Sequence, residues 1–124
     1  MRDWNVLITP DAVNDLDSIY CYISDELMEP GIAAKQIGRI KAAITKLNHM
    51  PYRHPLVRFE PWKSKGLRHM PINNYLVFYI VLESKDSVLV MRTLYSKRDI
   101  EAVLGDSLML SQLTGLENIN SNDL

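Results

Sequence analysis

The stretch LVMRTLYSKRDIEAVL, residues 89–104, joins a run of apolar residues to three basic side chains and a tyrosine. Arg92, Lys97 and Arg98 offer positive charge, and a guanidinium can bind two phosphate or carboxylate oxygens at once. Tyr95 lies between them and its hydroxyl can donate or accept a proton. The segment therefore indicates either a site for a negatively charged ligand or cations that hold the fold together.

The alternation of apolar residues in the strand gives Arg92 a different expected environment from Lys97 and Arg98. Arg92 alternates with Val90 and Leu94 in an apolar strand, so we expect its side chain to be at least half buried and paired, with an acid of the first helix or with the main chain. Lys97 and Arg98 are expected to begin a helix, where positive charge opposes the helix dipole at a cost of some tenths of a kcal/mol. Such a cost suggests that Lys97 and Arg98 serve a ligand.

Charge is unevenly distributed, although the formal net charge is only −1. Residues 1–29 hold one base and seven acids, whereas residues 30–69 hold nine bases and one acid. An acidic helix beside a basic one, both solvated, would explain part of this pattern. The bases at 53–68 lie beyond the predicted helices, and a surface that gathers them would attract phosphate or an acidic partner. The predicted binding residues are Lys63, Lys65, Arg68, Lys97 and Arg98.

Length and composition fit one compact domain, with 124 residues of which 47% are hydrophobic. No apolar run approaches the roughly 18 residues of a membrane span, and the start lacks the features of a secretory signal, so we expect a cytoplasmic protein without membrane contact. The single Cys21 cannot form an internal disulfide, and no second cysteine stands at metal-site spacing. We therefore expect neither a metal nor a cofactor.

The first half of the chain predicts a strand followed by two helices. WNVLIT at 4–9 alternates like a short strand, and Thr9 followed by Pro10 is typical of a helix start. We expect EPG at 29–31 to end the first helix and Met50-Pro51 to end the second. The predicted buried stripes are Val13, Leu16, Tyr20, Ile23 and Leu27 on the first helix, and Ala33, Ile37, Ile40, Ile44 and Leu47 on the second. Together the helices form an antiparallel hairpin.

The second half predicts a meander of three antiparallel strands at 67–72, 75–82 and 87–95, after an irregular connection at 51–66. The middle strand is apolar on both faces and belongs in the centre of a sheet, with the hairpin on one side and another segment partly covering the other. Ser96 and Asp99 have the spacing of a capping box, which predicts a short helix at 97–104 that ends at Gly105. The fold class is α+β.

The segments ITPDAVNDLDSIYCYI, GLRHMPINNYLVFYIV and VMRTLYSKRDIEAVL, in this order, resemble the RelE/ParE superfamily of bacterial type II toxin-antitoxin toxins. The resemblance spans residues 4–104, so we assign 1–104 to a toxin domain and 105–124 to a C-terminal tail. It implies that the sheet and the terminal helix form a basic groove, and that a cognate antitoxin wraps the toxin with an acidic or amphipathic segment. A homodimer is compatible with the pattern, and the sequence does not decide the oligomeric state.

The resemblance implies one of two activities. Members similar to RelE cleave mRNA on the ribosome without a metal, and in that case Arg98, His69 and Tyr95 are the candidate catalytic residues. His69 and Tyr95 also have a purely structural interpretation, as aromatic residues packed on strands. Leu76 and Leu104 stand where RelE carries an arginine and a tyrosine, which departs from the nuclease pattern.

Members similar to ParE act on DNA gyrase and need no hydrolytic centre. The long predicted hairpin resembles this branch, so the sequence favours a growth-arresting toxin directed at gyrase. An mRNA endoribonuclease is the alternative, and a non-toxic module that binds an acidic peptide is the second alternative.

The tail combines apolar residues with acids and has no base. This composition is the one that an antitoxin segment presents to a basic groove. The tail is therefore either a frayed end or a segment that covers apolar sheet surface in this molecule or in a neighbouring one, where the antitoxin would otherwise bind. The apolar residues are Leu108, Leu110, Leu113, Leu116 and Ile119.

Overall fold

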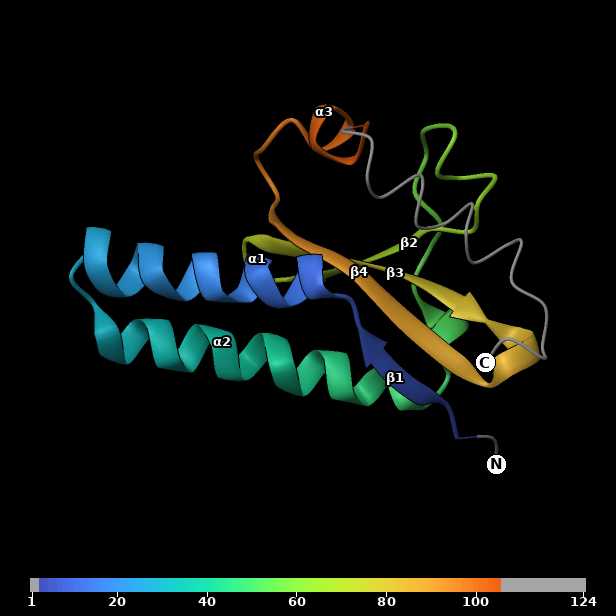
Figure 1. Cartoon of the computed structure of the whole chain (residues 1–124), viewed down its shortest axis with the longest axis horizontal. Coiled ribbons are helices and arrows are strands. Elements are labelled where there is room, and N and C mark those ends of the chain that lie inside the picture. The colour runs from blue at the N-terminus through green and yellow to red at the C-terminus, as the bar shows by residue number, and fades with distance from the viewer. Residues whose placement is uncertain (1–2, 106–124) are drawn as a thin grey trace.

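The computed structural model describes residues 3–105 and shows the predicted α+β fold (Figure 1). The described part contains one four-stranded sheet, in which β1 pairs parallel to β4 and the other neighbours pair antiparallel. Strands β3 and β4 coincide with the predicted runs. In spatial order the strands are β1 (Asn5–Ile8), β4 (Ser87–Tyr95), β3 (Tyr75–Leu82) and β2 (Arg68–Ile72).

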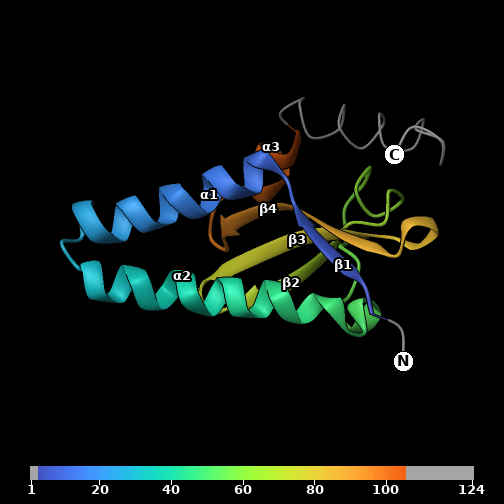
Figure 2. The same cartoon turned by 60° about the horizontal axis from the view of Figure 1, so that its bottom comes forward.

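Two long helices form the predicted antiparallel hairpin on one face of the sheet (Figures 1 and 2). Helix α1 (Pro10–Cys21) continues into a π-helical turn, η1 (Tyr22–Glu26), and helix α2 (Pro30–Thr45) returns beside it. The start of α1 is confirmed, because the Ala12 amide donates to the Thr9 hydroxyl over 3.1 Å and Pro10 occupies the first helical position. The hairpin tip extends past the end of the sheet in both views.

The predicted buried stripe of the first helix is partly wrong. Leu16 and Ile23 are buried, but the side chains of Val13, Tyr20 and Leu27 are 46%, 41% and 52% exposed. The face against the sheet instead centres on Ala12, Leu16 and Ile19, so the small Ala12 fills a position that the pattern gave to a larger neighbour. The π-turn widens the last helical turn and changes the register before Leu27. All five predicted stripe residues of the second helix are buried.

The position of the break between the helices also differs from the prediction. Met28 takes a left-handed conformation with φ 54°, and Pro30 and Gly31 already belong to the first turn of α2. Proline is accepted at the first helical position because its missing amide needs no partner there. The turn therefore precedes the proline instead of being caused by it.

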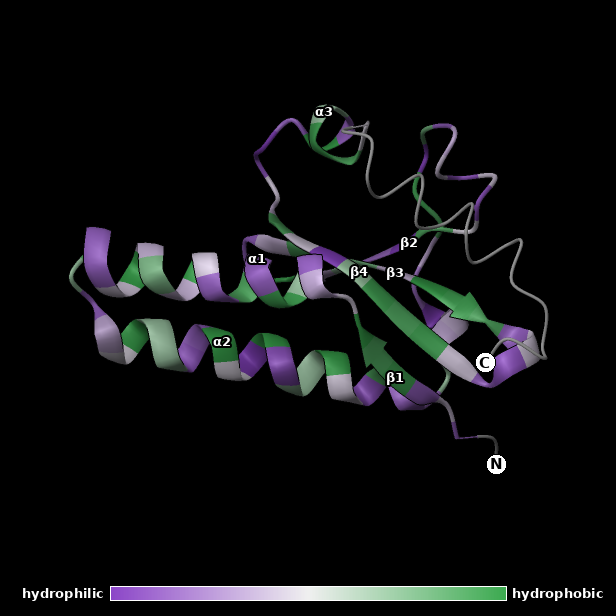
Figure 3. Cartoon of the chain, viewed as in Figure 1, coloured by the Kyte–Doolittle hydropathy of each residue, from purple (hydrophilic) through white to green (hydrophobic). Residues whose placement is uncertain are grey.

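Apolar residues fill both faces of the sheet, as the continuous apolar run of β3 predicts. Figure 3 shows the hydrophobic colour along much of β3 and β4. On the hairpin side, Val77 and Tyr79 of β3 pack with α1 and α2. On the other side, Phe78 and Ile80 pack under the connection at 57–67 and under helix α3 (Ile100–Gly105). That connection carries Trp62, which is 2% exposed. The second face is thus a closed hydrophobic core.

The final helix begins three residues later than predicted. Asp99 caps it, since its carboxylate accepts from the Ala102 amide over 3.2 Å and its carbonyl from the Val103 amide over 3.1 Å. Ser96 instead donates its amide to the Asn74 carbonyl over 2.8 Å. Lys97 and Arg98 lie in the turn before α3, so the argument from an unfavourable helix dipole does not apply to them.

The proposed tail at 105–124 lies outside the described residues, except for Gly105, which ends α3. Among the helices at 3–105, none is long and apolar enough to cross a membrane.

Candidate functional site: a cleft beneath the hairpin tip

A cleft of about 870 Å³ lies where the hairpin extends past the sheet. The end of α1 and η1 form one wall, the start of α2 a second, and the ends of β3 and β4 with the turn before α3 complete it. Two of the predicted site residues, Tyr95 and Arg98, line it. The other lining residues used below are Asp15, Tyr22, Ile23, Leu27, Ile32, Gln36, Tyr75, Arg92 and Thr93.

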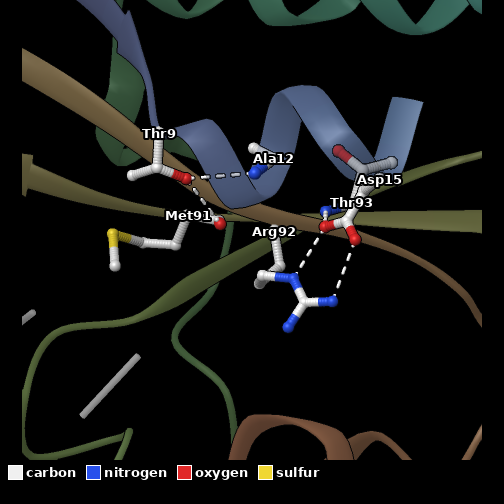
Figure 4. A network of polar contacts seen from close by, with 6 residues as sticks. All are labelled: Thr9, Ala12, Asp15, Met91, Arg92 and Thr93. Carbon is white, nitrogen blue, oxygen red and sulfur yellow. Dashed lines mark hydrogen bonds and ion pairs between the residues drawn. The ribbon is translucent and has the colours of Figure 1, made fainter. Parts of the chain in front are cut away.

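Arg92 is held in the wall of this cleft by Asp15 of α1 (Figure 4). The Asp15 carboxylate accepts from Arg92 Nε over 2.7 Å, from Arg92 Nη2 over 2.9 Å and from the Thr93 amide over 2.9 Å. The Arg92 and Asp15 side chains are only 19% and 12% exposed. The hydrogen bonds to Asp15 raise the pKa of Arg92, and they outweigh burial, which lowers it. The prediction of a half-buried, paired Arg92 is confirmed.

Three tyrosines converge on the same cleft. The rings of Tyr75 and Tyr95 meet edge to face at 5.9 Å between centroids. Burial raises the pKa of Tyr75, and the neighbouring Tyr95 and Tyr22 raise it further, so Tyr75 keeps its proton at neutral pH. Tyr22 and Tyr95 are 56% and 39% exposed. The cleft therefore presents aromatic surface with hydroxyl groups that donate and accept hydrogen bonds.

Arg98 supplies a positive charge at the rim of the cleft. Its amide donates to the Tyr95 carbonyl over 3.1 Å, which fixes the turn, while its side chain is exposed. Within residues 3–105 its guanidinium has no acid to pair with, in contrast to Arg92. Lys97 is exposed in the same turn and does not line the cleft.

The other predicted site residues, Lys63, Lys65, Arg68 and His69, do not line the cleft. Arg68 supports the chain near β2: its Nη1 donates to the His54 carbonyl over 2.7 Å, and its guanidinium lies 5.1 Å from the centre of the Tyr52 ring. His69 stacks on Phe78 at 6.4 Å between ring centroids, on the face that the second core fills.

The sequence did not single out Tyr22, Gln36 or Thr93 as site residues. Gln36 and Thr93 are 9% and 1% exposed, and their Nε2 and Oγ1 atoms have no hydrogen-bond partner among residues 3–105. The Gln36 carbonyl oxygen does accept from the Asn73 amide group over 3.1 Å. Buried polar atoms without partners are uncommon in folded proteins. The position of a glutamine inside an apolar helix stripe is a sequence signal that could have identified Gln36.

Histidine protonation is expected to destabilise the region around β2. Burial, followed by nearby positive charge, lowers the pKa of His54 and of His69 below the ordinary 6.5. The unfolded chain therefore binds these protons first as the pH falls, and stability present at neutral pH is lost through and below pH 6.5. Between pH 7.5 and 5 we expect the melting temperature of the wild type to fall a few degrees further than that of a His54→Asn, His69→Asn variant. Equal slopes in scanning calorimetry would contradict this.

Within residues 3–105, no three histidine, cysteine, aspartate or glutamate side chains gather as a metal site would require.

The family match, together with the shared fold, identifies the chain as a small α+β toxin of the RelE/ParE superfamily. The family model for the ParE toxin of the type II toxin-antitoxin system parDE matches residues 6–100, and the chain belongs to that family. Comparison with curated protein sequences gave no match.

Solved structures share the fold at low sequence identity. A chain of the chromosomal ParDE toxin-antitoxin system from P. aeruginosa is 19% identical with a TM-score of 0.64, over 78% of this chain and 100% of that chain. A chain of the RelBE2 toxin-antitoxin complex from Mycobacterium tuberculosis is 21% identical with a TM-score of 0.55, over 77% and 93%. A mutant E. coli RelE toxin in the free state is 11% identical with a TM-score of 0.56, over 92% and 97%.

Proposed function

We propose that this toxin arrests growth in the cytoplasm by inhibiting DNA gyrase without a hydrolytic centre, and that a cognate antitoxin neutralises it. The observation that carries the proposal is the closed second face of the sheet. Leu104 is fully buried there, and Leu76 packs against the same cluster. These are the positions where RelE-like nucleases are expected to carry a tyrosine and an arginine.

The separation of the candidate catalytic groups supports the same proposal. General acid-base catalysis needs its groups within hydrogen-bond reach of one substrate. Tyr95 and Arg98 line the cleft, whereas His69 lies against Phe78 and does not. The hairpin, with 12 residues in α1, five in η1 and 16 in α2, has the length that resembles the ParE branch.

Ribosome-dependent cleavage of mRNA is the second candidate, because the cleft joins Tyr95 to Arg92 and Arg98. The Arg98 guanidinium would stabilise charge on a phosphate, whereas the Arg92 guanidinium is already occupied by Asp15, and a tyrosine would move a proton. In this alternative the catalytic set is confined to the cleft, without His69.

Inducing the chain without its antitoxin separates these functions. DNA supercoiling and the positions of mRNA ends on ribosomes are recorded in the same culture. We expect relaxed or broken DNA with intact mRNA. Cuts in phase with codons would replace the proposal with the nuclease, and normal growth with unchanged DNA and mRNA would indicate a non-toxic peptide-binding module.

A further inference from the structure

We infer that a basic patch at the outer edge of β2 binds the phosphate backbone of duplex DNA. The inference rests on the proposed function, because gyrase acts on DNA and would bring the toxin beside it. None of the patch residues lines the cleft, and the connection that carries most of them lies at the opposite end of the molecule from the hairpin tip (Figures 1 and 2). The members of the patch are Arg53, His54, Arg58, Lys63, Arg68 and His69.

The chain returns along the outer edge of β2 and thereby gathers charges that are distant in sequence. The His69 amide donates to the Pro55 carbonyl over 3.1 Å, and Leu56 forms an isolated antiparallel bridge with Arg68. Residues 46–69 hold six lysines and arginines, all three histidines of the chain and a single acid. Folding this segment against one strand concentrates positive charge on one part of the surface.

Two arginines of the patch are held by neutral partners and keep their charge. Arg68 Nη1 donates to the His54 carbonyl over 2.7 Å, and the Arg53 guanidinium donates to the His49 carbonyl. A carbonyl oxygen carries no net charge, so these hydrogen bonds orient the guanidinium groups without neutralising them. In this respect Arg53 and Arg68 differ from Arg92 in the cleft, which is paired with a carboxylate.

The two histidines of the patch lie in a positive field. Burial, followed by the nearby Arg53 and His69, lowers the pKa of His54. Burial, followed by the nearby Arg58, lowers the pKa of His69. Among residues 3–105, no carboxylate offsets these cations at either ring. The charge of the patch is therefore felt at its centre and is not limited to single exposed side chains.

Acids near the patch offset only part of this charge. Glu60 is the single acid of the segment, and its carboxylate accepts from the Ser64 amide over 2.8 Å and from the Ser64 hydroxyl over 2.7 Å. These hydrogen bonds lower the pKa of Glu60, so it is ionised and faces Lys63. Glu83 borders the patch, where it accepts from the Tyr52 hydroxyl over 2.8 Å. Positive charge remains in excess.

Arg58 and Lys63 are the patch residues that can reach a phosphate most directly. Both side chains are exposed, and among residues 3–105 neither forms an ion pair. A guanidinium binds two phosphate oxygens at once, whereas an ammonium acts as a point charge. We therefore assign the phosphate contacts to these two residues, and a supporting field to the other cations of the patch.

The aromatic residues near the patch favour duplex DNA over a single strand. Single-stranded nucleic acids are bound largely by stacking their bases on exposed aromatic rings. Trp62 is buried, and the Arg68 guanidinium lies 5.1 Å from the centre of the Tyr52 ring. The His69 ring is stacked on Phe78. The patch thus offers charge without a stacking platform, which fits a duplex whose phosphates face outward and whose bases are paired inside.

Fluorescence anisotropy with a labelled short DNA duplex tests the inference on the full chain. Wild-type affinity should fall as salt rises, because bound cations displace counterions from DNA. The variant Arg58→Glu, Lys63→Glu should bind at least about tenfold more weakly, with a salt slope smaller by about two. The control Lys35→Glu, Lys41→Glu makes the same charge change at exposed positions of α2 and should lose less than about threefold. Equal losses, or no salt-dependent binding by wild type, would overturn the inference.

Two further measurements guard the result against trivial explanations. Arg58→Gln, Lys63→Gln removes the charges without adding acids, so it should keep the wild-type melting temperature within a few degrees and still bind DNA several-fold more weakly. Undiminished binding by this folded variant would contradict the inference. A single-stranded RNA with the same number of phosphates should bind more weakly than the duplex, and tighter binding of the RNA would show that the choice of duplex DNA is wrong.

Gyrase supercoiling, measured with the same proteins, separates this inference from the proposed function. Wild-type toxin that binds DNA but leaves gyrase active would refute the proposed function and not the patch. Inhibition of gyrase by a wild type that does not bind DNA would refute the patch alone. If Arg58→Glu, Lys63→Glu loses inhibition yet binds DNA as tightly as wild type, the patch holds an acidic protein surface and the inference is wrong.

Discussion

Replacing Arg98 with alanine should abolish growth arrest while leaving the melting temperature within a few degrees of the wild type. The Arg98 side chain is exposed at the rim of the cleft, and within residues 3–105 it contacts no acid whose loss would destabilise the fold. Only its amide supports the turn, through the Tyr95 carbonyl, and that hydrogen bond survives the substitution. Truncating an arginine that anchors an interface typically costs about 2–4 kcal/mol, or roughly 30- to 1000-fold in affinity for the target.

The measurement is colony survival after induction, with calorimetry of the purified variant. Lys97→Ala is the matched control, since Lys97 is an exposed base in the same turn that does not line the cleft. It should leave growth arrest nearly intact. If Arg98→Ala instead unfolds the protein, Arg98 is structural and the site is wrongly placed.

The sheet was largely predictable because its sequence signals are local. The bounds of β3 and β4 follow from apolar runs ended by Asn73-Asn74 and Lys85-Asp86. Met28, Asn73 and Asp86 all take left-handed backbone conformations, and asparagine and aspartate are residue types that signal such turns. Methionine carries no such signal, so the break before Pro30 could not be placed from sequence.

The helix details failed where two local signals competed. Ser96 and Asp99 are both good caps, and tertiary contact decided between them because the Ser96 amide bonds to the Asn74 carbonyl of the neighbouring turn. On α1 the predicted helical spacing of apolar residues was correct, but the predicted buried face was rotated away from the real one. The reason is that the small Ala12 was not counted as a buried residue.

The cleft could be predicted only in part. The basic and aromatic character of residues 92–98 pointed to Tyr95 and Arg98, and the alternation of β4 predicted a paired Arg92. Tyr22, Gln36 and Thr93 are separated by up to 71 residues, and they meet only because the hairpin is longer than the sheet beneath it. The difference in length between the hairpin and the sheet depends on how distant segments pack, so local sequence patterns do not predict it.

The second large effect is expected at Asp15, where one carboxylate joins α1 to β4. Asp15→Ala leaves the Arg92 guanidinium without its partner and the Thr93 amide without its acceptor, and both groups are largely buried. Removing one member of a buried ion pair leaves the other member desolvated and without a partner, so we expect the free energy of unfolding to fall by about 2–4 kcal/mol. For a domain of this size this corresponds to a melting temperature lower by roughly 8–15 °C.

A double-mutant cycle separates the ion pair from the other roles of Asp15. If the pair dominates, Arg92→Ala should also destabilise, and the double variant should lose clearly less than the sum of the single losses. Asp17→Ala removes an exposed acid from the same helix and should change stability by less than about 0.5 kcal/mol. Additive losses at Asp15 and Arg92 would mean that the two side chains act independently and that the cleft wall is held by packing alone.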